Sequence, residues 1–139
     1  GRLKDTLTNV EATGEFVVNL ATEALFDEMN ATSANVGPEV DEFALAGLTA
    51  TPARLVKPPL VAQSPAQLEC RYLQTIALAS NDAEWRNAVV LGEVVGVHIA
   101  DEMLSAEGRV DTALMRPLAR LGYMEYTVVE KVFSHGRPE

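Results

Sequence analysis

The segment NAVVLGEVVGVHIA, residues 87–100, decides the fold that this sequence predicts. Apolar residues occupy both its odd and its even positions, and this density of valine and leucine favours a β-strand. Both faces of such a strand should be covered, and a chain of 139 residues covers one face more easily than two. We therefore expect a homodimer whose interface lies near this strand.

One charged residue interrupts the apolar pattern of this strand. Glu93 stands among valines, and a buried carboxylate needs a partner. We expect Glu93 to be ionised and paired with Arg71 of the neighbouring strand; the alternative is that it faces a polar cavity. That neighbouring strand is predicted over residues 67–79, where the alternation places Cys70 on the apolar face and Glu69 on the polar one.

The remaining elements are shorter. We expect a helix over residues 6–13, capped by Asp5 or Thr6 and stopped by Gly14, and a second over 22–32. A third, short helix should begin after a cap at Asp41 and end at Gly47. Strands are predicted over 15–20 and 51–57, and a last amphipathic piece over 123–133.

Composition excludes several classes of function. The chain has the length of one domain, and no apolar run is long enough for a membrane helix. The net charge of −9 repels nucleic acid and anionic lipid, so we expect neither as a partner. The single cysteine cannot form an internal disulfide, which indicates a reducing, cytoplasmic compartment.

Few residues carry a recognisable chemical pattern. His98 and His135 are far apart in sequence and Cys70 stands alone, so we expect no metal site. Cys70 fits a buried structural thiol better than a nucleophile. For His98 we favour a packed or interfacial role over a catalytic one, and no catalytic residue can be assigned.

The most informative candidate site is the stretch RLKDT, residues 2–6. Arg2 and Lys4 are the only basic residues among the first fifty, against nine acidic ones. They flank a helix start, where backbone N–H groups are free and the Thr6 hydroxyl can donate. This combination predicts an anion site suited to a phosphate, with Lys4 as its main ligand. Asp5 would repel phosphate, so we assign it to capping or to cofactor hydroxyl groups.

Several short segments together resemble one known family. They are KDT at 4–6, NVE at 9–11, EFVVNL at 15–20, LECR at 68–71, GEVV at 92–95, VHI at 97–99, PLARLG at 117–122 and Tyr126. The chain resembles the flavin reductase-like family of FMN-binding split-barrel proteins over nearly its whole length.

The resemblance implies a mainly β fold, an antiparallel split β-barrel with flanking α-helices, in which residues 1–139 form one domain. It implies a homodimer with FMN near the subunit interface, and it assigns the phosphate of FMN to the segment of Arg2, Lys4, Asp5 and Thr6. The implied activity is hydride transfer between NAD(P)H and flavin, with the flavin carrying the chemistry.

Two departures keep an alternative open. The family has barrel strands before the Lys-Asp-Thr segment, so we expect this chain to lack the N-terminal portion of its domain. Many flavin reductases also carry a Gly-Asp-His string where this chain has Arg86-Asn87-Ala88. The alternative to an NAD(P)H-dependent enzyme is therefore a non-catalytic flavin-binding or structural homologue.

Overall fold

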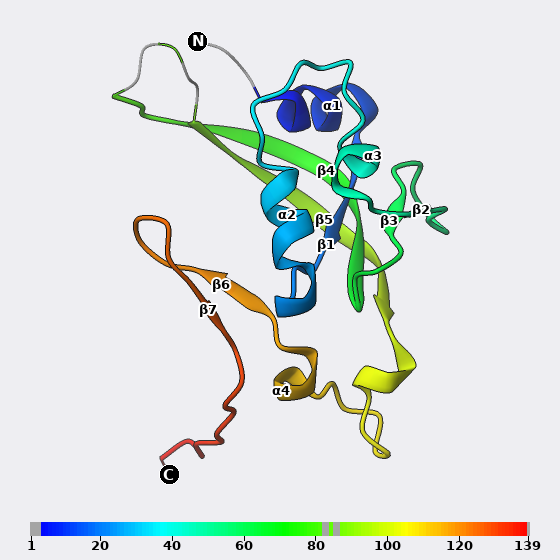
Figure 1. The fold of residues 1–139 in the computed structure, drawn as a ribbon, viewed down its shortest axis with the longest axis vertical. Coiled ribbons are helices and arrows are strands. Elements are labelled where there is room, and N and C mark those ends of the chain that lie inside the picture. The colour runs from blue at the N-terminus through cyan, green and yellow to red at the C-terminus, as the bar shows by residue number, and fades with distance from the viewer. Residues whose placement is uncertain (1–3, 82–83, 85–86, 139) are drawn as a thin grey trace.

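A three-stranded antiparallel sheet forms the centre of the computed structural model, which describes residues 4–81, 84 and 87–138 (Figure 1). Its strand order is β1-β4-β5, with β1 at Glu15–Asn19, β4 at Ala66–Leu78 and β5 at Asn87–Ile99. Two smaller antiparallel pairs join β2 (Ala50–Thr51) to β3 (Leu60–Val61) and β6 (Leu118–Arg120) to β7 (Tyr126–Val128). The mainly β fold and the strands expected at 15–20, 67–79 and 87–100 are confirmed.

Short helices flank the sheet (Figure 1). They are α1 (Asp5–Thr13), α2 (Phe26–Ala31) with a preceding 3₁₀ turn at Glu23–Leu25, α3 (Glu42–Ala46), a 3₁₀ turn at Asp101–Met103, and α4 (Thr112–Met115). Glycines end two of them in the left-handed conformation, Gly14 at φ 70° and Gly47 at φ 68°. Residues with a side-chain Cβ rarely adopt this conformation, so the sequence located both ends correctly.

The helix starts only partly follow the sequence-based expectation. The Asp41 carboxylate accepts the Phe43 N–H at 2.9 Å, which confirms the cap of α3. The cap expected from Asp5 or Thr6 is wrong, because Lys4 occupies the N-cap position of α1 and no side-chain hydrogen bond caps the helix. The described part of the chain therefore leaves the start of α1 without a side-chain cap.

Another segment of the chain covers part of the polar face of the sheet. The register aligns Asn19 with Gln67 and His98, and Val17 with Glu69 and Gly96, so these side chains share one face. The segment 54–64 crosses this face. The strand expected over residues 51–57 is wrong, because β2 ends at Thr51 just before a proline and residues 54–57 bond to side chains.

The opposite face of the sheet is apolar and partly open. Cys70 is buried there, as expected. The Phe16 ring passes over Gly92, where an added Cβ would lie 2.5 Å from the ring. Val18, Val94 and Val97 belong to the same face and remain 45%, 49% and 60% exposed. A continuous apolar area therefore remains uncovered by the described chain.

The expectation for Glu93 is wrong. Glu93 is exposed, and although it lies opposite Arg71 in the register, the two side chains form no ion pair in the described structure. The buried carboxylate of the sheet is Glu69, whose exposed fraction is 0%. The alternation of polar and apolar residues separated the two faces of β4. It did not show that a segment distant in sequence covers the polar face beside Glu69.

The C-terminal part stands apart from the central sheet (Figure 1). The hairpin β6–β7 contacts α2 through an edge-to-face pair of the Phe26 and Tyr126 rings, whose centroids are 5.1 Å apart. Of the amphipathic piece expected over 123–133, only Tyr126–Val128 forms a strand, and Phe133 remains 89% exposed.

Candidate functional site

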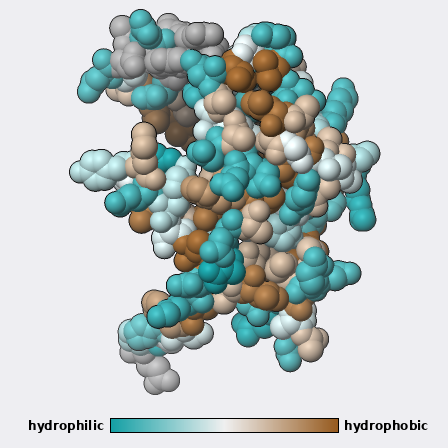
Figure 2. Space-filling view, viewed as in Figure 1, coloured by the Kyte–Doolittle hydropathy of each residue, from teal (hydrophilic) through white to brown (hydrophobic). Residues whose placement is uncertain are grey.

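A pocket of about 590 Å³ lies among α1, β1, α2 and α3. Its lining is mainly apolar and includes the rings of Phe16 and Phe43. Three carboxylates, Glu15, Glu28 and Glu42, also line it and make its polar side acidic. On the face seen in Figure 2, apolar side chains gather at the end of the molecule that carries α1 and α3. The volume is in the range of small-molecule and cofactor sites.

Of the residues predicted to bind phosphate, Thr6 lines this pocket. Lys4, Asp5 and Thr6 are brought together and exposed at the start of α1. Arg2 lies outside the described residues. Lys4 has extended backbone angles, and its carbonyl accepts the Thr8 N–H at 3.2 Å, which closes the first turn. The uncapped N–H groups of that turn and the partial positive charge of the helix end favour an anion.

One wall of the pocket comes from residues 58–61. Pro58, Pro59 and Val61 line the pocket. The segment 57–61 is fixed to β1 at two points, where Glu15 Oε2 accepts the Lys57 N–H at 2.9 Å and Asn19 Oδ1 accepts the Val61 N–H at 2.8 Å. Hydrogen bonds to polar side chains of the sheet, and not pairing with a neighbouring strand, therefore fix this wall.

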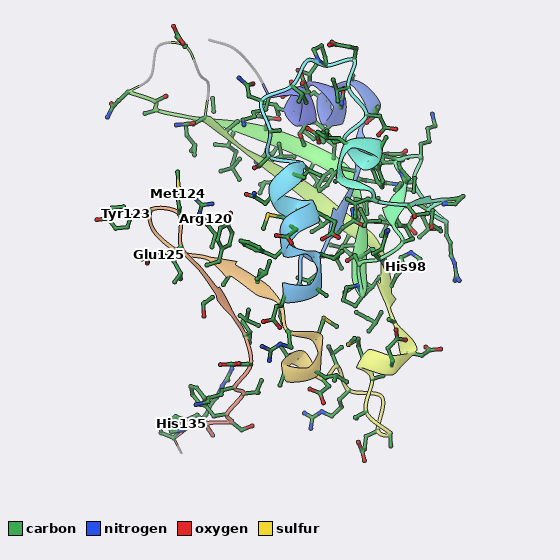
Figure 3. All side chains as sticks on the ribbon, in the orientation of Figure 1. His98, Arg120, Tyr123, Met124, Glu125 and His135 are labelled. Carbon is green, nitrogen blue, oxygen red and sulfur yellow. The ribbon has the colours of Figure 1, made fainter. Side chains whose placement is uncertain are left out.

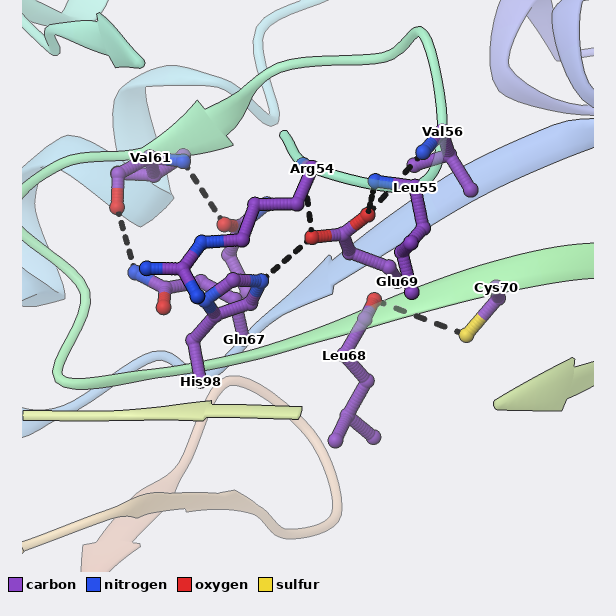
Figure 4. A network of polar contacts seen from close by, with 10 residues as sticks. Arg54, Leu55, Val56, Val61, Gln67, Leu68, Glu69, Cys70 and His98 are labelled. Atoms are coloured by element: carbon purple, nitrogen blue, oxygen red, sulfur yellow. Dashed lines mark hydrogen bonds and ion pairs between the residues drawn. The ribbon is translucent and has the colours of Figure 1, made fainter. Parts of the chain in front are cut away.

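Glu69 makes the densest set of these contacts (Figure 4). Its Oε1 accepts the Arg54 N–H at 3.0 Å, and its Oε2 accepts the N–H groups of Leu55 at 2.6 Å and Val56 at 3.1 Å. On the other side, His98 Nε2 lies 2.5 Å from Oε1. Burial alone would raise the pKa of Glu69, but the three backbone donors and the His98 ring outweigh it and lower the pKa to about 2. Glu69 is thus a buried, ionised carboxylate at neutral pH.

Sequence reasoning did not find Glu69 as a buried group. Gln67, Glu69 and Arg71 are polar at every second position of β4, a pattern typical of the solvent-facing side of a strand. The available signal was Gly96, since a glycine within a strand often marks a close approach of backbone. Gly96 lies opposite Glu69, and a Cβ added there would come within 3.3–3.4 Å of Leu55 and Glu69.

The histidine and cysteine are placed as the sequence predicted. His98 is half-buried and bonded to Glu69, so it is a packed residue. Burial raises the pKa of the Cys70 thiol, which is the behaviour of a structural cysteine. Among the described residues, no three His, Cys, Asp or Glu side chains cluster as metal ligands would. The helices described are all too short or too polar to span a membrane.

A second group of functional interest lies at the tip of the β6–β7 hairpin (Figure 3). Tyr123 and Met124 are 93% and 89% exposed there. Arg120 braces this tip, because its guanidinium donates to the Tyr123 carbonyl at 2.6 Å and to the Tyr126 hydroxyl, and it lies 4.7 Å from the centroid of the Tyr126 ring. The brace holds Tyr123 at φ 58°, an unusual angle for a tyrosine.

Comparison with known proteins identifies the family of this chain. The flavin reductase like domain matches residues 1–125. An uncharacterised protein of Halalkalibacterium halodurans is 35% identical over 138 residues, which is 99% of this chain and 66% of that protein. The chain therefore spans just under two thirds of this relative's length.

Solved structures with the same fold extend this result. Nitrilotriacetate monooxygenase component B from Bacillus cereus superposes with a TM-score of 0.84 at 29% identity, over 95% of this chain and 65% of that one. The 2-nitrobenzoate 2-nitroreductase of Pseudomonas fluorescens gives a TM-score of 0.81 at 26% identity, over 96% and 64%. Further neighbours are split-barrel flavin reductase-like proteins. From the match over residues 1–125, we conclude that the chain belongs to the flavin reductase-like family.

Proposed function

We propose that this chain binds FMN with the phosphate at the start of α1, and that the whole protein transfers hydride between NAD(P)H and flavin. The observation that carries the proposal is the start of α1, which has no side-chain cap, where Lys4 is the N-cap residue and Thr6 lines a pocket large enough for a cofactor. A phosphate fits this donor set, because a cation, a hydroxyl and free N–H groups all favour a dianion.

The charge distribution supports this orientation of the cofactor. Glu15, Glu28 and Glu42 line the pocket and would repel a phosphate placed inside it. A phosphate would therefore be held outside the pocket, near Lys4, while the ring system of the flavin would enter between the aromatic side chains of the lining. Asp5 is left to bond the hydroxyl groups of the ribityl chain.

The reaction itself depends on the flavin. When bound, FMN supplies the hydride-accepting chemistry, and the residues of this chain bind and orient it. A monooxygenase component and a nitroreductase among the structural neighbours support redox work of this kind. The rival is a flavin-binding homologue without turnover. Yellow flavin retained after purification and NADH oxidation that requires FMN would support the enzyme, whereas bound flavin without NADH or NADPH oxidation would favour the rival.

We also propose a twofold homodimer in a reducing, cytoplasmic compartment. The exposed Val18, Val94 and Val97 form one apolar area on the sheet. Burying such area is favourable by about 25 cal/mol per Å². A second copy covering this face would satisfy the two-sided apolar pattern of β5, and the lone cysteine fits the compartment.

A further inference from the structure

Every backbone N–H from Arg54 to Lys57 is accepted by a side-chain carboxylate of the sheet. Glu69 accepts three of them, and Glu15 accepts the one from Lys57. The next two residues are prolines, which have no N–H to offer. This stretch is thus held in place by two side chains where a strand would be held by its neighbour.

We propose that Glu69 is a positioning residue, whose hydrogen bonds hold segment 54–57 on the sheet and thereby set the position of the pocket wall at Pro58 and Pro59. We call this set of hydrogen bonds the latch. His98 holds the Glu69 carboxylate in the orientation in which it accepts them. The inference rests on the proposed function only where it concerns flavin. The latch itself rests on the contacts of Glu69.

The geometry separates the latch from ordinary core packing. Glu69 is fully buried, and such a carboxylate is tolerated only with donors on both oxygens. Both oxygens are engaged, and no buried side-chain oxygen or nitrogen of the described residues lacks a partner. Of the segment itself only Val56 is buried, while Leu55 is 52% exposed. One buried valine therefore packs the segment, and the Glu69 carboxylate holds three of its four backbone N–H groups.

Cleavage by trypsin can report the release of segment 54–57 from the sheet. Trypsin cleaves after arginine and lysine but not before proline, so within 54–57 it can cut only the Arg54–Leu55 bond, since Pro58 follows Lys57. Arg71 lies in the middle of β4 with strands on both sides, so a cut there requires the sheet to open. The ratio of the two cuts distinguishes local release of the segment from global unfolding.

The test compares Glu69→Gln with the control Glu93→Gln, which makes the same chemical change at an exposed position. We expect Glu69→Gln to speed cleavage at Arg54–Leu55 by about tenfold or more, as the loss of charge-assisted hydrogen bonds implies. Cleavage at Arg71, which requires the sheet to open, should remain much slower than cleavage at Arg54–Leu55 in every variant. His98→Leu should be intermediate, and His98→Gln, whose amide can still donate, should behave more like wild type. Unchanged cleavage at Arg54–Leu55 in Glu69→Gln, or cleavage at Arg71 that is as fast as at Arg54–Leu55, would overturn the latch.

A second measurement links the latch to the pocket. FMN binding, followed by flavin fluorescence, should weaken in Glu69→Gln and not in Glu93→Gln. If Glu69→Gln releases the segment but leaves the affinity for FMN unchanged, the positioning role of Glu69 is overturned. If the wild-type protein itself fails to bind FMN, the proposed function is wrong, and the cleavage result still decides whether Glu69 fastens the segment.

Discussion

Glu69 and His98 come from different strands, 29 residues apart in sequence, and His98 Nε2 lies 2.5 Å from Glu69 Oε1. The contact joins an imidazole that is 22% exposed to a carboxylate that is fully buried. It joins β5 to the wall of the pocket through a single side chain of β4. The Glu69 carboxylate therefore bonds both to β5 and to the segment that leads into the pocket wall.

Glu69→Gln should lower the melting temperature by roughly 5–10 °C at neutral pH. The amide keeps one acceptor oxygen, but its NH₂ group would face the backbone N–H donors of Leu55 and Val56 or the His98 ring. Glu93→Gln, at an exposed position, should change the melting temperature very little. Thermal unfolding followed by circular dichroism measures both. Equal losses in the two variants would contradict the assignment of Glu69 as the buried carboxylate.

The stability contributed by Glu69 should disappear in acid. Its pKa is lowered in the folded protein from the ordinary 4.5 to about 2. The contribution is therefore complete above pH 4.5 and is lost as the pH falls through the folded value near 2. The difference in melting temperature between wild type and Glu69→Gln should shrink from pH 5 to pH 2. A difference that stays constant over this range would show that the charge of Glu69 is not what stabilises the fold.

Lys4→Ala should weaken FMN binding by about tenfold or more, because a hydrogen bond to a charged group contributes about 1.5–3 kcal/mol. Riboflavin lacks the phosphate and should be affected much less. Flavin fluorescence titrations with the two ligands make the comparison. Equal losses for FMN and riboflavin would show that Lys4 does not hold the phosphate.

Val97→Lys should dissociate the proposed homodimer, because Val97 is 60% exposed on the apolar face of the sheet. A charge there would be buried without a partner in the complex. Val40→Lys is the matched control, since Val40 is 37% exposed in a turn after α2. Sedimentation velocity at micromolar concentration measures the outcome. A wild-type protein that sediments as a monomer would remove the basis of this prediction.

Gly92→Ala should destabilise the fold by about 1–3 kcal/mol through overpacking. The added Cβ would lie 2.5 Å from the Phe16 ring and 3.0 Å from the Arg71 carbonyl oxygen. Gly122→Ala is the control, because a Cβ there meets no atom within 4 Å. Urea unfolding of the two variants tests the difference. Similar midpoints would mean that the Phe16 ring moves aside without cost.

The sequence by itself determined the elements whose signals are local. Alternation located β4 and β5, and Gly14, Gly47 and Asp41 located helix ends, because each acts through its own backbone or its nearest neighbours. The Lys4-Asp5-Thr6 segment was likewise visible, since a helix start and its flanking charge are properties of adjacent residues.

Only the tertiary structure decided which carboxylate is buried. Alternation assigns residues to two faces of a strand, but it does not state which face a distant segment will cover. Register shifts between Glu69 and Cys70 and between Tyr72 and Gln74 further change which residues of β5 lie opposite β4. Glu69 is buried because residues 54–56 cross the sheet where Gly96 leaves room, and Glu93 is exposed because nothing described crosses above it. Burial is set by contacts between residues far apart in the chain, and a one-dimensional pattern does not contain them.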